Sequence, residues 1–223
     1  MTGRLVAGSI RAVFFDAVDT LLHICPPAAD VYAEAGAKLG YSLGVDIIRA
    51  RFREAFRQQD AEDARHGWST SEERECRRWQ EIVYFVFQDD NANLFQHLWQ
   101  HFAQPSAWQV FPEAGEVIAA LSKRMPTLGL ASNFDRRLHA VAAAFPELAN
   151  LRIRLISSEI GWRKPSPNFF AEMARQAGCE PAQILYVGDD PANDYDGATA
   201  AGLQSLLLKP NHGLRSVREL LMI

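Results

Sequence analysis

The sequence predicts an α/β protein in which a doubly wound, Rossmann-like parallel sheet is interrupted by an inserted helical bundle. Two observations predict this. Strand-like apolar runs alternate with amphipathic stretches in the second half of the chain, as in folds built from parallel strands and helices. Between about residues 26 and 105, apolar residues instead recur at helical spacing. We predict a core domain from residues 1–22 and 106–223, and a helical domain from residues 23–105.

The first predicted strand is the apolar run Ala12–Phe15, which leads directly into Asp16. A buried strand that ends in an acid delivers a carboxylate to the edge of a parallel sheet. An aspartate at such an edge is a candidate nucleophile. We therefore expect Asp16 to lie at the reaction site of an enzyme.

Helical periodicity defines the insertion, in which three or four helices are expected. The repeating apolar positions are Ile48, Phe52, Ala55 and Phe56, then Cys76, Trp79, Val83 and Val86, and finally Leu94, Leu98 and Phe102. Ser69, Thr70 and Ser71 precede Glu72 and Glu73, which is the pattern of a helix N-terminal capping box. The middle helix should begin there.

Strands and helices alternate again after Pro105. Predicted strands are Thr127–Ala131, Ile153–Ser157, Ile184–Val187 and Ser205–Leu208, and Glu113–Lys123 is a predicted helix. Ser132 and Asp189 each follow an apolar strand, as Asp16 does. Ligands bind beyond the carboxyl ends of strands in such sheets, so these three segments should converge in one crevice.

Composition favours a small-molecule enzyme in the cytoplasm. The net charge of −4 and pI of about 5.9 provide no basic surface for nucleic acid. Cys25, Cys76 and Cys179 form no CxxC pattern, which fits a reducing compartment. Arg11 and Asp16 interrupt the apolar stretch near the start, so neither a signal segment nor a membrane span is expected. We expect no nucleic-acid or membrane partner, and leave a monomer and a homodimer open.

Four segments in chain order resemble the motifs of the haloacid dehalogenase (HAD) superfamily with a helical C1-type cap. They are Phe14–Leu22, Leu130–Asn133, Gly161–Pro165 and Val187–Asp194. This resemblance implies an HAD-like α/β core whose inserted helices form a cap over the site. It also implies a hydrolase, phosphatase-like and Mg²⁺-dependent, that acts on a small phosphorylated metabolite through an aspartyl-phosphate.

The resemblance also implies a role for each matching residue. Asp16 would be the nucleophile and a metal ligand, and the carbonyl of Val18 and the carboxylate of Asp189 would be further metal ligands. Ser132 and Asn133 would hold the phosphoryl group. Lys164 would neutralise charge, and Asp194 would orient water or Lys164. Lys164 is one of four lysines in the chain.

One position departs from the superfamily pattern. Phosphatases of this superfamily usually carry a general acid two residues after the nucleophile, where this chain has Val18. The resulting Asp-x-x-Asp-Thr motif resembles the group of haloacid dehalogenase-like hydrolase domain-containing protein 3. Loss of a general acid typically costs about 10² to 10⁴ in rate, so low activity or a preference for acyl and aryl phosphates is expected. Asp19 and His23 are open candidates for a substitute donor.

Other interpretations start from the same residues. Asp16 could cap a turn, Ser132 and Asn133 could form an ordinary loop, and Asp189–Pro191 could open a helix. A binding or regulatory protein that has kept the fold without turnover is therefore one alternative. A 2-haloacid dehalogenase is a second, because a halide leaves without a proton.

Overall fold

The computed structural model describes residues 9–208 and 213–221. Five strands form one parallel sheet in the order β5-β4-β1-β6-β7. Their bounds are β1 Ala12–Phe15, β4 Thr127–Ser132, β5 Ile153–Ile156, β6 Ile184–Gly188 and β7 Gln204–Leu207. Each bound lies within one residue of its prediction, and the predicted doubly wound sheet is confirmed.

Strand β1 is the centre of the sheet and is covered on both faces. Ala12 pairs with Thr127 of β4 on one side and Ile184 of β6 on the other. Val13 and Phe15 belong to one apolar cluster, whereas Ala12 and Phe14 belong to another. This alternation follows from the two-residue period of a strand.

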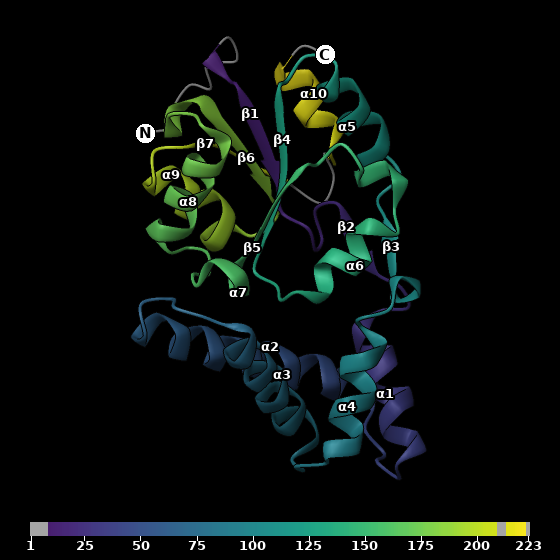
Figure 1. Ribbon diagram of the computed structural model, residues 1–223. Coiled ribbons are helices and arrows are strands. Elements are labelled where there is room, and N and C mark those ends of the chain that lie inside the picture. Colours follow the sequence, from purple (N-terminus) through teal and green to yellow (C-terminus); the bar gives the residue numbers. More distant parts are fainter. Residues whose placement is uncertain (1–8, 209–212, 222–223) are drawn as a thin grey trace.

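Helices cover each face of the sheet (Figure 1). The first cluster includes α5 Ala114–Ser122, α6 Arg137–Ala143 and α10 Arg215–Leu221, and the second includes α8 Pro167–Ala177 and α9 Gly197–Ala200. Shorter turns are α7 Ser157–Ile160, η2 Pro105–Ala107, η3 Pro146–Leu148, η4 Pro181–Gln183 and η5 Pro191–Asp196. Both faces are thereby removed from water.

The insertion contains four helices with a hydrophobic cluster of their own. They are α1 Ala28–Lys38, α2 Val45–Arg65, α3 Glu72–Phe87 and α4 Ala92–His101. The hydroxyl of Ser71 accepts from the N–H of Arg74 at 3.1 Å and caps α3 where the sequence predicts a helix start. In Figure 1 the four helices form a separate layer beyond one end of the sheet.

The chain enters and leaves the insertion through two short strands. β2 Leu22–Ile24 and β3 Trp108–Val110 pair antiparallel, a feature that the sequence pattern does not predict. His23, in β2, packs on Phe111 with ring centroids 4.9 Å apart. Across residues 9–208 and 213–221, no helix is both long and apolar enough to cross a membrane.

Candidate active site

Three adjacent strands bring polar residues to one edge of the sheet. Asp16 follows β1, Ser132 ends β4, and Asp189 follows β6. Because β1 lies between β4 and β6, residues far apart in sequence become neighbours here. The Ser132 side chain hydrogen-bonds the Asp16 carboxylate, and this contact partly opposes the rise in the Asp16 pKa that burial causes.

Lys164 is the buried cation of the site. Its Nζ donates to Asp16 Oδ1 at 2.6 Å, to Asp194 Oδ1 at 2.6 Å and to the Tyr186 hydroxyl at 2.7 Å. Burial by itself lowers the pKa of Lys164, but Asp16 and Asp194 outweigh it and raise the pKa above its usual value. The side chain therefore remains an ammonium between two carboxylates.

Tyr186 belongs to the site although sequence reasoning missed it. It lies within β6, where it reads as one more apolar strand residue. Its hydroxyl donates to the carbonyl of Ala131 at 2.7 Å and accepts from Lys164. The available signal was chemical, because a buried tyrosine needs a partner for its hydroxyl. Tyr186 holds the lysine head in place.

Three carboxylates form a cluster suited to a divalent cation. Oxygen atoms of Asp16, Asp189 and Asp194 lie within 4.8 Å of one another. Burial is the main cause that raises the pKa of Asp16 to about 6 and that of Asp189 to about 7, and repulsion from Asp194 contributes to both values. The positive charge of the Lys164 ammonium does not offset the negative charge of three carboxylates. Carboxylate oxygens are ligands that Mg²⁺ prefers, so the donor set fits such an ion.

We expect the stability of the protein to depend on pH because these carboxylates repel one another. An aspartate in the unfolded chain has a pKa of 3.8, and folding raises the pKa of Asp16 and Asp189 above this value. Between about pH 4 and 7 the folded state therefore binds more protons than the unfolded state. The stabilising contribution is present at low pH and is lost as pH rises through these pKa values. Mg²⁺ should consequently raise Tm more at about pH 7.5 than at about pH 5, where protons compete. Calorimetric scans at both pH values check this, and an equal shift would contradict it.

The final motif divides two tasks between neighbouring acids. Asp190 accepts from the N–H groups of Ala192 at 2.8 Å and Asn193 at 2.9 Å, which caps η5. Asp189 instead faces the cluster, where its Oδ1 accepts from the Thr20 hydroxyl at 3.1 Å. Asp194 lies in the π-helical turn η5, a geometry that recurs at functional sites. The helix-opening interpretation holds for Asp190 alone.

Gly188 leaves room for the Asp194 carboxylate. A Cβ at this position would lie 2.2 Å from Asp194 Oδ2 and 2.6 Å from Asp194 Cβ. We expect Gly188→Ala to displace Asp194 and weaken Mg²⁺ binding by about 10- to 100-fold, as loss of supporting contacts at metal sites does. Calorimetric titration with Mg²⁺ measures this. Gly44→Ala, just before α2, is the control for a glycine substitution outside the cluster, because its backbone is extended and a Cβ there would meet no atom within 4 Å. Equal affinities of the two variants would contradict the expectation.

The amide of Asn133 holds the lysine segment. Its Oδ1 accepts from the N–H of Lys164 at 2.7 Å, and its Nδ2 donates to the carbonyl of the same residue at 3.0 Å. The amide is thus engaged with the backbone next to the predicted phosphoryl site. Its visible role is to position Lys164.

The two open candidates for a proton donor lie beyond Val18. Val18 is partly buried and pairs with Leu22 through an isolated bridge. Asp19 has a left-handed backbone (φ 58°), its N–H donates to the carbonyl of Leu22 at 2.7 Å, and its side chain is exposed. It therefore occupies a turn, while His23 lies against Phe111 at the neck of the insertion.

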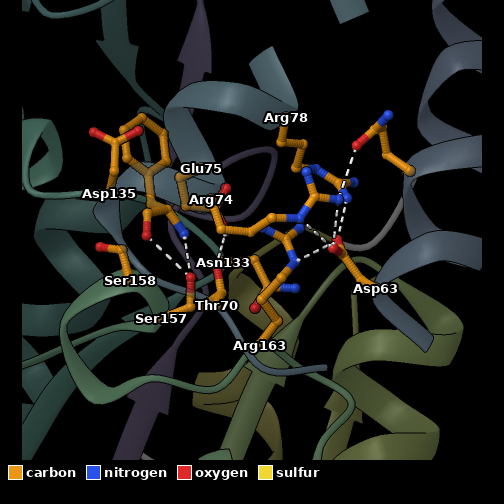
Figure 2. Close-up of polar contacts among 12 residues, drawn as sticks. Asp63, Thr70, Arg74, Glu75, Arg78, Asn133, Asp135, Ser157, Ser158 and Arg163 are labelled. Carbon is orange, nitrogen blue, oxygen red and sulfur yellow. Dashed lines mark hydrogen bonds and ion pairs between the residues drawn. The ribbon is translucent and has the colours of Figure 1, made fainter. Parts of the chain in front are cut away.

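A buried network of charges joins the helical insertion to the residue before Lys164 (Figure 2). Arg163 pairs with Glu75 of α3, and its Nε lies 3.4 Å from Asp63 Oδ2 of α2. Asp63 also accepts from Arg74 at 2.7 Å and from Arg78. Asp63 and Glu75 are only 1% and 2% exposed, so each depends on these partners.

Backbone hydrogen bonds reinforce the same junction. The N–H of Thr70 donates to the carbonyl of Gly161 at 3.0 Å, and the N–H of Arg163 donates to the carbonyl of Trp68 at 2.9 Å. The turn between α2 and α3 thereby pairs with the segment that carries Lys164. These hydrogen bonds thus join the helical insertion directly to the part of the reaction site that contains Lys164.

Comparison with known proteins identifies the family of this chain. The model of the haloacid dehalogenase-like hydrolase family matches residues 10–202, and the chain belongs to this family of hydrolases. A human haloacid dehalogenase-like hydrolase domain-containing protein 3 is 31% identical over 209 residues, which cover 89% of this chain and 82% of the relative. The resemblance stated from the motifs is confirmed.

Solved structures share the fold at low sequence identity. A Bacillus subtilis protein described as a HAD-hydrolase and bound to magnesium has a TM-score of 0.74 at 20% identity, covering 96% of this chain and 99% of its own. A HAD phosphatase from Thermococcus onnurineus has a TM-score of 0.69 at 22% identity, with coverages of 95% and 98%. An L-2-haloacid dehalogenase from Xanthobacter autotrophicus has a TM-score of 0.71 at 18% identity, with coverages of 96% and 83%.

Proposed function

We propose that this hydrolase is a Mg²⁺-dependent phosphohydrolase in which Asp16 is the nucleophile. The observation that carries the proposal is the placement of Asp16, which contacts the ammonium of Lys164 and belongs to one cluster with the carboxylates of Asp189 and Asp194. A halide displacement needs no such acidic cluster. Transfer of a dianionic phosphoryl group needs a large local positive charge, and the cluster is suited to hold it.

The residues then divide the reaction as follows. Asp16, the carbonyl of Val18 and Asp189 would hold the Mg²⁺, which supplies positive charge to the phosphoryl oxygens. An Asp16 oxygen attacks phosphorus, the bond to the leaving oxygen breaks, and an aspartyl-phosphate forms. Water then releases phosphate and regenerates Asp16. Ser132 donates to a phosphoryl oxygen, Lys164 balances charge, and Asp194 orients Lys164, with which it pairs at 2.6 Å.

The helical insertion also has a role in this proposed function. Residues 23–105 would act as a cap domain over the site, so that a small phosphorylated metabolite is enclosed between the insertion and the sheet. We place the enzyme in the cytoplasm, as a monomer or homodimer. Val18 at the position of the usual acid keeps a weakly active or purely binding protein as one alternative, and a 2-haloacid dehalogenase as another.

Turnover measurements separate these functions. Phosphate release from acetyl phosphate, p-nitrophenyl phosphate and sugar and nucleotide monophosphates is measured with Mg²⁺ and with chelator, beside chloride release from 2-chloropropionate. We expect Mg²⁺-dependent release from the activated esters. Chloride release that survives the chelator would instead identify a dehalogenase, and Mg²⁺ binding without any turnover would identify a binding protein.

Restoring an acid at position 18 should change which esters react. We expect Val18→Asp to raise kcat/KM for alkyl phosphates by about 10- to 100-fold, because an alkoxide needs a proton to leave, with a smaller gain for p-nitrophenyl phosphate. Val18→Asn is the matched control, since it has the same shape without an ionisable proton. If both variants change the alkyl-to-aryl ratio equally, the missing acid does not limit the reaction.

A further inference from the structure

A cavity of about 360 Å³ lies between the helical insertion and the sheet, and its walls are strongly aromatic. Tyr32, Phe56, Trp79 and Trp99 line it from the insertion, and Trp108 and Phe134 line it from the core side. A volume of this size lies at the lower end of the range for sites that enclose small molecules.

The cavity adjoins the reaction site. Val18 and Asn133 line it, and they lie two residues after Asp16 and directly after Ser132. Val18 therefore contributes an apolar wall beside the reacting group, where the superfamily usually has its acid. A leaving group that departs from phosphorus toward this wall meets hydrocarbon rather than a proton donor.

Two of the polar lining residues are engaged in hydrogen bonds within the protein. Arg137 donates to both Asp135 oxygens at 2.8 and 2.7 Å, donates to the Trp99 carbonyl at 3.0 Å, and stacks 3.3 Å from the centroid of the Trp99 ring. The Asn133 amide is engaged with the backbone of Lys164. Asp19 and Tyr32 also line the cavity, but most of its lining surface is hydrocarbon. A sugar or nucleotide would bury most of its hydroxyls against this hydrocarbon surface, which is unfavourable.

We propose that this cavity is the binding site for the organic part of an aryl monophosphate, an apolar aromatic alcohol esterified to phosphate. The inference rests on the proposed function, because the phosphoryl group is taken to lie at Asp16. In the reaction an Asp16 oxygen bonds to phosphorus while the bond between phosphorus and the phenolic oxygen breaks. The electron pair of that bond leaves with the phenolate. The phenolate takes its proton from water after release, so Val18 is no handicap. Aromatic walls and the absence of an acid at residue 18 thus select the same class of leaving group.

A series of 4-alkylphenyl phosphates, from hydrogen to butyl, tests the proposal with the full-length protein and Mg²⁺. Their phenols have nearly equal acidity, so hydrophobic contact is the variable. We expect kcat/KM to rise by up to about fourfold per methylene until the cavity is full. Glycerol and sugar phosphates should react at least about 100-fold more slowly than the best member, because most of their hydroxyls would lie against hydrocarbon. The corresponding arylphosphonates, which cannot be hydrolysed, should bind with the same dependence on length, measured through tryptophan fluorescence.

Two alanines of α1 provide matched variants. Ala28 lines the cavity, whereas Ala37 is exposed outside it. We expect Ala28→Leu to lower kcat/KM and phosphonate affinity for the propyl compound about tenfold more than for the unsubstituted one, because overfilling is unfavourable. Ala37→Leu should leave the profile as in the wild type. Thermal unfolding of both variants verifies that they fold.

The outcomes distinguish this inference from the proposed function. Turnover of acetyl phosphate with no dependence on alkyl length, or with sugar phosphates preferred, overturns the aryl site and leaves the phosphohydrolase standing. Length-dependent phosphonate binding without turnover of any phosphate supports the site and contradicts the proposed function. Absence of both turnover and phosphonate binding overturns both.

Discussion

Asp16→Asn should lower Mg²⁺-dependent phosphate release by about 10⁴-fold or more, the scale on which loss of a covalent nucleophile acts. The amide keeps the size of the side chain but cannot attack phosphorus. Lys164 retains Asp194 at 2.6 Å, so its ammonium is not left unpaired. Because burial raises the pKa of the Asp16 carboxyl, the neutral amide should also leave the apo-protein at least as stable as the wild type at pH 7.

The control for this variant is Asp196→Asn, which makes the same chemical change at an exposed residue of η5. Its activity and Tm should match those of the wild type. A variant Asp16→Asn that folds and keeps more than a tenth of the activity would show that another group attacks the substrate. A single-turnover reaction quenched with acid provides the second readout, because it traps an aspartyl-phosphate that hydroxylamine then cleaves. This hydroxylamine-labile phosphate should be lost with Asp16.

Arg163→Met should destabilise the protein by about 3–5 kcal/mol, because removal of one partner leaves a buried charge uncompensated. Glu75, 2% exposed, would lose its guanidinium, and Asp63 would retain Arg74 and Arg78. For a protein of this size the loss corresponds to a fall in Tm of roughly 6–20 °C. Thermal unfolding followed by circular dichroism measures it. Turnover should fall as well, since Arg163 anchors the segment that presents Lys164.

A matched control and a rescue accompany this variant. Arg175→Met removes an exposed arginine paired with Glu172 at 2.6 Å, and it should leave Tm near the wild-type value. The double variant Arg163→Met with Glu75→Gln removes both charges and should recover part of the lost stability. If Arg163→Met and Arg175→Met shift Tm equally, the buried network does not hold the insertion to the core.

Local pattern was sufficient for the five strands of the parallel sheet and for the helices of the insertion. Ala12–Phe15 is a strand because four apolar residues are buried on both faces, and the Asp16 that follows must then leave the sheet at its edge. The helices of the insertion follow from apolar residues at helical spacing, and Ser71 marks the start of α3. Each of these signals lies within a few neighbouring residues.

Side-chain roles that depend on distant partners were not predictable in the same way. Tyr186 reads as a strand residue until its hydroxyl is found against Lys164, 22 residues away. The hydrogen bonds between the Asn133 amide and the backbone of Lys164 were likewise not predictable, because the two residues are 31 positions apart. The three-residue strands β2 and β3 are too short to show a period, and they exist because the two ends of the insertion lie side by side.

The sequence by itself determined the α/β core with its helical insertion and the set of acids, serine and lysine available to the site, because periodicity and strand-end chemistry are local. Only the tertiary structure decided that Tyr186 meets Lys164 across 22 residues and that Arg163 meets Glu75 across 88. It also decided that Val18 faces an aromatic cavity. Contacts of this range arise from the packing of whole elements against one another, which a pattern of neighbouring residues does not specify.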